Sequence, residues 1–128
     1  MSDFYHVWFS TKARKPVMEG EIGEDIKQLL IETAKRTGVQ LLDVETVADH
    51  AHLLIEVTEE QTLPGILHQL KGASARQIFL MYPSLKLDME HNSFWQRGYG
   101  RRKITPAEIP TVRNYIRTQQ GRPLRHDG

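Results

Sequence analysis

Two histidines separated by a single residue are the first candidates for chemistry in this chain. His50 and His52 lie in the segment 49–57, where hydrophobic residues alternate with other side chains. Successive side chains of a strand point to opposite faces, so both imidazoles would share one face. A spacing of about 6–7 Å by the strand rise would let them hold one divalent cation between them. The pair alone does not establish a site, because the chain contains six histidines.

A tyrosine and a glutamine near the C-terminus form a second candidate pair. Tyr115 and Gln119 are four residues apart, so they would share one face of a helix. A tyrosine can act as a nucleophile, and attack on a phosphodiester needs a divalent cation to polarise the phosphoryl oxygens. Two histidines and an amide oxygen could hold that cation and leave positions open for phosphate and water. Taken alone, Tyr115 is better explained as an aromatic side chain packed in a core.

Hydrophobic periodicity predicts the elements that must position these residues. Strands are expected at 4–10, 39–47 and 49–57. Helices are expected at 21–37, which Gly38 would end, and at 63–81, which Pro83 would end. The segment 94–100 is expected to be a strand that bends at its glycines, with 101–104 either continuing or leaving it. A last helix would begin at Pro106 or Pro110 and end within 121–123, before a loose tail at 124–128.

This order of elements predicts an α+β fold of the ferredoxin-like, or split β-α-β, type. Its antiparallel sheet would carry two helices on one face, and an extra C-terminal helix would carry the tyrosine. The histidine strand would be central, and the helices would cover its face with Ala51, Leu53 and Ile55. His50 and His52 would then look out of the open face. We expect residues 1–128 to form a single domain, because no linker or repeat divides the chain.

The composition excludes several kinds of chemistry. The chain contains no cysteine, which excludes disulfides, thiolate zinc sites and a cysteine nucleophile. It also contains no run of about 18 apolar residues, so we expect no membrane-spanning helix. The N-terminus lacks the basic-then-apolar layout of a signal peptide, and we expect a cytoplasmic protein.

Positive charge is clustered along the chain, although the net charge is only +1. The basic clusters lie at 12–15, 71–76, 97–103 and 113–125. If they meet on one face, they would form a patch that binds a polyanion. The alternative, that they are scattered charges that keep the protein in solution, is about equally good on this evidence.

Five segments together resemble the single-tyrosine HUH transposases, the small transposases of bacterial insertion sequences and of repeat-associated palindromic elements. The matching segments are Tyr5-His6-Val7-Trp8-Phe9-Ser10-Thr11-Lys12, Ala48-Asp49-His50-Ala51-His52-Leu53-Leu54, Leu70-Lys71-Gly72-Ala73-Ser74-Ala75-Arg76, Trp95-Gln96-Arg97-Gly98-Tyr99-Gly100 and Val112-Arg113-Asn114-Tyr115-Ile116-Arg117-Thr118-Gln119. They cover nearly the whole chain, in the order found in the family. The histidine pair is weak evidence alone, but it is strong in combination with the Lys-Gly-x-Ser and Tyr-x-x-x-Gln segments.

The resemblance implies a specific mechanism. His50, His52 and Gln119 would hold Mg²⁺ or Mn²⁺, and Tyr115 would attack a phosphodiester of single-stranded DNA. Attack would give a 5′-phosphotyrosine link and a free 3′-hydroxyl. The resemblance also implies recognition of hairpins near the element ends, and a homodimer in which one subunit's tyrosine helix can complete the other's histidine site. The segment 100–106 departs from the family pattern because it is stiffer and more basic than the flexible stretch that many relatives have there.

By hypothesis the basic segments would contact DNA phosphates. The candidate residues are Lys71, Arg76, Arg97, Arg101, Arg102 and Lys103. Trp95 or Tyr99 could stack on a base, although core packing explains Trp95 at least as well. Two other functions stay open: a ferredoxin-like nucleic-acid-binding module without chemistry, and a metal-dependent phosphoesterase that activates water and does not need Tyr115.

Overall fold

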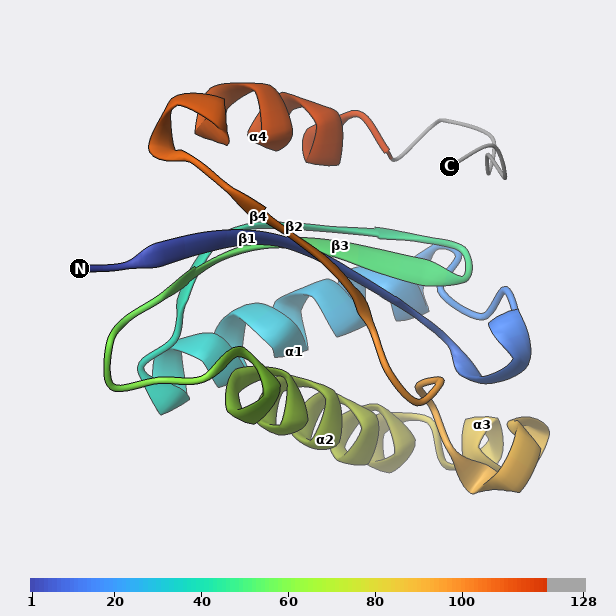
Figure 1. The fold of residues 1–128 in the computed structure, drawn as a ribbon. Coiled ribbons are helices and arrows are strands. Elements are labelled where there is room, and N and C mark those ends of the chain that lie inside the picture. Colours follow the sequence, from blue (N-terminus) through green and yellow to red (C-terminus); the bar gives the residue numbers. More distant parts are fainter. Residues whose placement is uncertain (120–128) are drawn as a thin grey trace.

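The computed structural model describes residues 1–119, which fold as an antiparallel sheet with helices on both faces (Figure 1). The strands are β1 Asp3–Ser10, β2 Gln40–Val47, β3 His50–Val57 and β4 Gly100–Ile104. The α-helices are α1 Glu21–Thr37, α2 Leu63–Met81, α3 Pro83–Asp88 and α4 Ile109–Arg117, and the short 3-10 turns are η1 Lys12–Arg14, η2 Glu90–Asn92 and η3 Pro106–Glu108. Within these residues, no helix combines the length and the apolar character of a membrane span.

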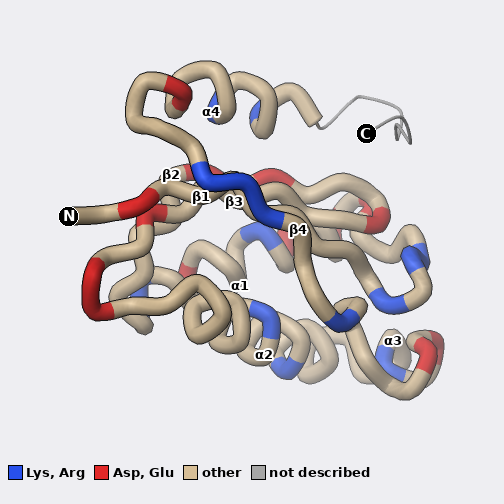
Figure 2. The backbone as a smooth tube through the Cα atoms, in the orientation of Figure 1, with Lys and Arg blue, Asp and Glu red and all other residues tan. Residues whose placement is uncertain are grey.

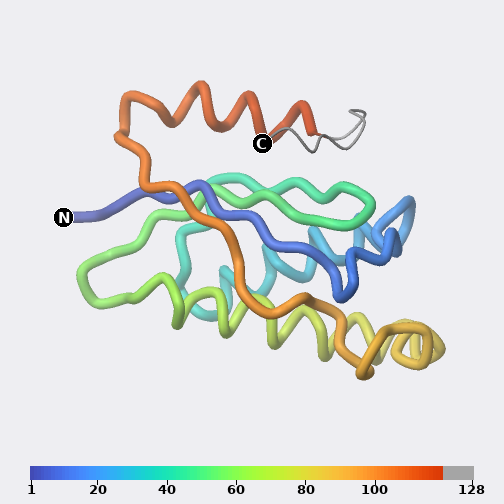
Figure 3. Tube along the Cα trace, turned by 45° about the vertical axis from the view of Figure 1, so that its right-hand side comes forward, coloured from blue at the N-terminus to red at the C-terminus, as the bar shows by residue number. Residues whose placement is uncertain are grey.

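The strand order in the sheet is β2-β3-β1-β4, and every neighbouring pair is antiparallel. The histidine strand β3 is therefore central, as predicted. Helices α1 and α2 lie together on one face of the sheet, and α4 lies on the opposite face in both views (Figures 1 and 3). This arrangement confirms the predicted ferredoxin-like α+β fold.

The main core lies between the sheet and the helices α1 and α2. The β3 residues Ala51, Leu53 and Ile55 are all fully buried there, so the predicted alternation of β3 is confirmed. The ends of both helices follow from local chemistry. Gly38 ends α1 in the left-handed conformation, with φ 75°, and the Thr62 hydroxyl accepts a hydrogen bond from the first turn of α2.

A second, smaller core covers part of the face that was expected to be open. Leu54 of β3 is fully buried against Ile104, and Val112 and Ile116 of α4 close over them. These two α4 residues are four apart, so they form one apolar stripe that needs a partner surface. The prediction of an open histidine face is therefore wrong over this part of the sheet, because an amphipathic helix and Leu54 bury each other.

Two predicted boundaries differ from the structure. The last strand begins only at Gly100, after Gly98 turns the chain with φ 87°. Helix α2 ends at Met81, before Pro83, as predicted, and Pro83 itself occupies the first turn of a further short helix, α3, where proline is tolerated. Helix α4 ends at Arg117, earlier than expected, and the predicted loose tail lies outside the described residues. Neither of these differences changes which strands pair.

Candidate active site

The two histidines are the first and third residues of β3, close to the turn that joins β2 to β3. Their ring centroids are 4.8 Å apart. His52 is only 7% exposed, whereas His50 is half-buried. Asp49, in the turn before β3, is 2.9 Å from His50 Nδ1 through Oδ1 and 3.2 Å from Arg14 Nε through Oδ2. Burial alone would raise the pKa of the Asp49 carboxyl, but the hydrogen bonds to His50 and Arg14 hold that pKa below its ordinary value. Asp49 is thus an ionised partner that orients the His50 ring.

A third histidine joins this pair across the sheet. His6 of β1 stacks on His52, and its Nε2 lies 3.1 Å from His52 Nδ1. Burial, and then the positive charge of Arg102, lowers the pKa of His6 to about 4. Burial, followed by the charges of His50 and His6, lowers the pKa of His52 to about 3. Both rings are therefore neutral at pH 7, which is the form of imidazole that binds a metal.

Tyr115 of α4 lies beside the same histidines. Its ring centroid is 5.8 Å from that of His52 and 5.7 Å from that of His6. The side chain is 44% exposed, so it is not the packed core aromatic that the sequence alone favoured. The structure therefore brings the solvent-accessible Tyr115 and the buried rings of His6 and His52 onto one face of the sheet, although the three residues lie far apart in the sequence.

Gln119 follows the end of α4 rather than extending its face. Its Nε2 donates a hydrogen bond to the backbone oxygen of Tyr115 at 2.9 Å, which folds the amide back toward the helix end. The backbone N–H of Gln119 donates to Ile116 O at 3.2 Å. The structure thus places Gln119 next to Tyr115, and it gives no hydrogen bond between the Gln119 amide and a histidine within residues 1–119.

The donor atoms in the site fit a small divalent cation. Because His50 Nδ1 is held by Asp49 and His52 Nδ1 by His6, each ring has Nε2 for a metal. Two imidazole nitrogens and an amide oxygen suit such an ion. In the described chain, no three His, Cys, Asp or Glu side chains are grouped to hold a metal, so a ligand set here needs the Gln119 oxygen or atoms from the substrate.

Lys71 differs from the other predicted DNA contacts because its ammonium already donates hydrogen bonds within the protein. Nζ donates to the backbone oxygens of Gln96 at 2.9 Å and Gly98 at 2.8 Å, and it lies 5.4 Å from the centre of the Phe9 ring. Burial holds the pKa of Lys71 below its ordinary value. This side chain stabilises the loop that leads into β4. Arg76 and Arg97 are exposed.

The basic residues of β4 do not share a face, although the strand stands out in Figure 2 as a continuous basic segment. Arg102 pairs in register with His6, so it lies on the histidine face, where Glu108 is 3.2 Å away. Arg101 and Lys103 pair with Val7 and Tyr5 and therefore point to the other face. The predicted basic patch is thus divided between the two faces of the sheet, and of these three side chains only Arg102 lies beside the site.

Trp95 is a core residue, so its interpretation as a base-stacking residue is wrong. It is 6% exposed, and its indole N–H donates to the Ser74 hydroxyl at 3.0 Å. Phe9 packs edge-on against the ring at 4.7 Å. A buried hydroxyl on α2 thus satisfies the indole, and the Ser74 side chain is not on the exposed side of that helix.

The other tryptophan, Trp8, lies on the histidine face, and sequence reasoning did not assign it to the site. Trp8 is 38% exposed, its ring centroid is 5.1 Å from that of His6, and it pairs in register with His52. It lies over Gly100 of β4, where an added Cβ would overlap the indole. Alternation along 4–10 would have placed His6 and Trp8 on the site's face, once this strand was paired with the histidine strand.

Solved structures with the same fold define the class of this protein. A crystal structure of a Deinococcus radiodurans R1 protein assigned as a transposase superposes with a TM-score of 0.76 and 29% identity, covering 95% of this chain and 94% of that one. A REP-associated tyrosine transposase bound to a REP hairpin superposes with a TM-score of 0.64 over 89% of this chain and 64% of that one; at 9% identity, this likeness shows the fold alone. The protein has the ferredoxin-like fold of these two structures.

The sequence assigns it to one family within that class. The chain belongs to the IS200-like transposases, whose family model matches residues 2–119. It is 32% identical over 115 residues to the ISDra2 transposase TnpA of Deinococcus radiodurans, covering 90% of this chain and 82% of the relative. It is also 30% identical over 95 residues to the IS200 transposase of Salmonella typhimurium, covering 74% of this chain and 62% of that one. The predicted family is therefore confirmed.

Proposed function

We propose that this transposase cleaves and rejoins single-stranded DNA at the ends of an insertion sequence, through a 5′-phosphotyrosine intermediate that Tyr115 forms. The observation that carries this proposal is the position of the Tyr115 ring, 5.8 Å from the His52 ring and still 44% exposed. A nucleophile must reach a strand that approaches from solvent, and the metal ligands must be preorganised beneath it. Both conditions fit this face of the sheet.

His50, His52 and Gln119 would hold the cation. When bound, Mg²⁺ or Mn²⁺ would polarise the phosphoryl oxygens and orient the scissile phosphate. The chain's own residues do the rest. The Tyr115 oxygen forms a bond to phosphorus while the bond from phosphorus to the 3′-oxygen breaks, and the proton lost by the phenol is balanced by the proton gained by the 3′-hydroxyl. Attack by a 3′-hydroxyl on the phosphotyrosine reverses these changes and rejoins the strand.

The DNA substrate would be a single strand that carries hairpins. The support is indirect: a protein of the same fold has been solved with a REP hairpin, and Arg102 places a positive charge on the histidine face. The exposed Arg76, Arg97 and Arg101, and Lys103, would contact phosphates further from the site. We also propose a homodimer with shared active sites, in which the Tyr115 helix of one copy can serve the histidines of the other.

A covalent adduct is the direct test. The protein would be incubated with pools of hairpin-bearing single-stranded oligonucleotides and Mn²⁺ or Mg²⁺, and a denaturing gel would show whether DNA remains attached. We expect a metal-dependent adduct that disappears in Tyr115→Phe and in His50→Ala. Cleavage that persists in Tyr115→Phe would mean a phosphoesterase that activates water. Binding without any adduct, with the protein's own element ends in the pool, would mean a DNA-binding module without chemistry.

A further inference from the structure

The position of the tyrosine helix depends on an irregularity in β2. The register of β2 with β3 shifts between Leu41 and Asp43, so that Asp43 stands opposite Leu54. A bulge of this kind re-aims side chains. Here it directs the Asp43 carboxylate to the side of the sheet that α4 covers, next to Leu42, whose side chain packs in the small core under the same helix.

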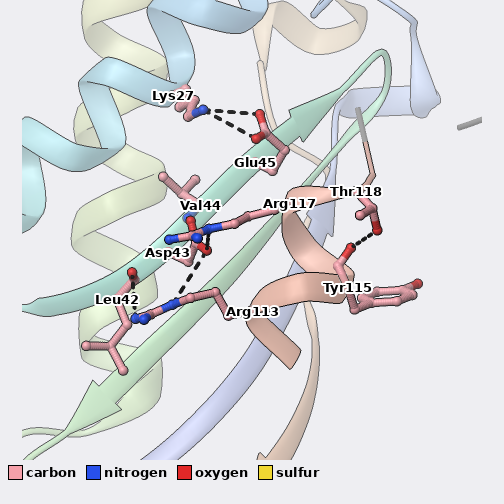
Figure 4. A network of polar contacts seen from close by, with 9 residues as sticks. All are labelled: Lys27, Leu42, Asp43, Val44, Glu45, Arg113, Tyr115, Arg117 and Thr118. Atoms are coloured by element: carbon pink, nitrogen blue, oxygen red, sulfur yellow. Dashed lines mark hydrogen bonds and ion pairs between the residues drawn. The ribbon is translucent and has the colours of Figure 1, made fainter. Parts of the chain in front are cut away.

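Two arginines of α4 meet this carboxylate. Arg117 Nε lies 2.9 Å from Asp43 Oδ2, and Arg113 Nε lies 3.8 Å from the same oxygen (Figure 4). A terminal guanidinium nitrogen of Arg113 also donates to Leu42 O at 3.3 Å. The Asp43 side chain is 15% exposed, whereas the side chains of Arg117 and Arg113 are 63% and 35% exposed, so the carboxylate is largely desolvated while both arginines keep part of their surface in solvent. Arg113 Nε is itself buried and has no hydrogen bond at 3.8 Å, so the carboxylate is the group that balances its charge.

Tyr115 projects from the opposite flank of the helix. It is two residues from each arginine, which places it about 200° around the helix axis from both. Figure 4 shows its ring pointing away from the Asp43 contact. Between the two flanks, Val112 and Ile116 rest on the sheet through apolar contacts, which are not directional. The Asp43 ion pairs and the hydrogen bond from Arg113 to Leu42 O are therefore the directional contacts that hold the rotation of α4. A rotation of about 20° would move a ring at the end of a tyrosine side chain by on the order of 2–3 Å.

We propose that Asp43 is a positioning residue: it sets the rotation of α4 on the sheet, and thereby the place of Tyr115 above His52 and His6. The effect of Asp43 on catalysis rests on the proposed function, because the rotation of α4 affects the reaction only if Tyr115 is the nucleophile. A displacement of about 1 Å at a reacting group can cost on the order of 100-fold in rate. Loss of the Asp43 charge should therefore slow adduct formation much more than it weakens DNA binding.

The first experiment measures the helix position without any catalysis. The chain has no cysteine, so Asn114→Cys on α4 and Lys35→Cys on α1 give two exposed sites for spin labels. We expect the distance distribution between the labels to broaden or shift when Asp43→Asn or Asp43→Ala is added. Glu32→Gln is the control, because Glu32 is an exposed carboxylate whose hydrogen-bond partner, Gln28, lies in α1 itself. An unchanged distribution in both Asp43 variants would overturn the proposal.

The second experiment compares two substitutions of Asp43 in the adduct assay. Asp43→Asn keeps the shape and removes the charge, whereas Asp43→Glu keeps the charge and lengthens the side chain. We expect the rate of adduct formation to fall at least tenfold in Asp43→Asn, with an unchanged Kd for DNA, and to recover partly in Asp43→Glu. Equal losses in both variants would indicate a packing role and would contradict the proposal. Absence of an adduct from the wild-type protein would instead reject the proposed function, while the spin-label result still decides the role of Asp43 in holding α4.

Discussion

His6 Nε2 lies 3.1 Å from His52 Nδ1, so a histidine of β1 holds the ring of a predicted metal ligand in β3. One of these two nitrogens must carry the proton of the hydrogen bond. If His52 Nδ1–H donates to His6, the lone pair of His52 Nε2 is left for a cation. The outer partner of a ligating histidine fixes its tautomer and orientation. The sequence pattern names His50 and His52 as the metal pair, whereas the structure adds His6 and Asp49 as the groups that orient them.

Removal of His6 should therefore weaken metal binding without removing a ligand. We expect His6→Ala to raise the Kd for Mn²⁺ by about 10- to 100-fold, because the loss of an outer partner has an effect of this size. Titration calorimetry with Mn²⁺ measures it directly. His68→Ala, on the exposed side of α2, is the matched control. An unchanged Kd in His6→Ala would show that His52 does not depend on this hydrogen bond.

Trp8 should contribute to DNA binding through stacking. Its indole is 38% exposed beside His6, on the face where a strand must lie to reach Tyr115. A stacked base contributes about 1–3 kcal/mol, so Trp8→Leu should raise the Kd for single-stranded DNA by roughly 5- to 150-fold, and Trp8→Phe by much less. Fluorescence anisotropy of a labelled oligonucleotide gives these constants.

The control for Trp8 is another exposed apolar residue far from the site. Leu87, in α3, is 81% exposed, and Leu87→Ala should leave the Kd unchanged. Equal affinity of Trp8→Leu and wild type would exclude base stacking at this position. A loss in Trp8→Phe as large as that in Trp8→Leu would mean that the indole acts through its contact with Gly100 rather than as a flat surface.

Much of the fold could be predicted because it rests on local signals. Alternation along 49–57 identified the buried face of β3, and Gly38 marked the end of α1 through the left-handed backbone conformation that glycine readily adopts. The errors arose where a contact distant in sequence decides the structure. The sequence left Trp95 open between base stacking and core packing, and the contact that decides for the core is the hydrogen bond to the Ser74 hydroxyl, 21 residues earlier.

The same reason explains what was missing from the candidate site. Spacing made His50 and His52 a candidate pair, whereas the role of Tyr115 came from the resemblance to the single-tyrosine transposases, which rests on short segments that are local in sequence. His6, Trp8 and Asp43 acquire their positions only when β1, β2, β3 and α4 pack together. The segment 5–12 was part of the resemblance, but it assigned no role to His6 or Trp8. The bulge before Asp43 is the clearest example of a feature that the sequence does not predict. It shifts the register of β2, yet β2 contains no glycine or proline that would indicate a bulge.

The Ser74 contact itself predicts a measurable loss of stability. Ser74→Ala would leave the buried Trp95 N–H without its hydrogen-bond partner, at a cost of about 1–3 kcal/mol in the free energy of unfolding. Urea denaturation followed by circular dichroism measures this cost. Ser84→Ala, at an exposed position of α3, should change the free energy of unfolding by less than about 0.5 kcal/mol. If both variants unfold at the same urea concentration, the hydrogen bond to Trp95 contributes nothing to stability.

The salt dependence of DNA binding can distinguish Arg102 from Lys71, which the sequence predicts as DNA contacts alike. Arg102 lies on the histidine face, so Arg102→Ala should remove about one phosphate contact and reduce the slope of log K against log salt for single-stranded DNA by about 0.7. Lys71 already donates to Gln96 O and Gly98 O, so Lys71→Ala should mainly loosen the loop before β4 and lower the free energy of unfolding. Binding measured between about 50 and 200 mM salt decides between these roles. A slope that falls equally in both variants would mean that Lys71 gives up its two carbonyl partners for DNA, and that the loop before β4 rearranges when the strand binds.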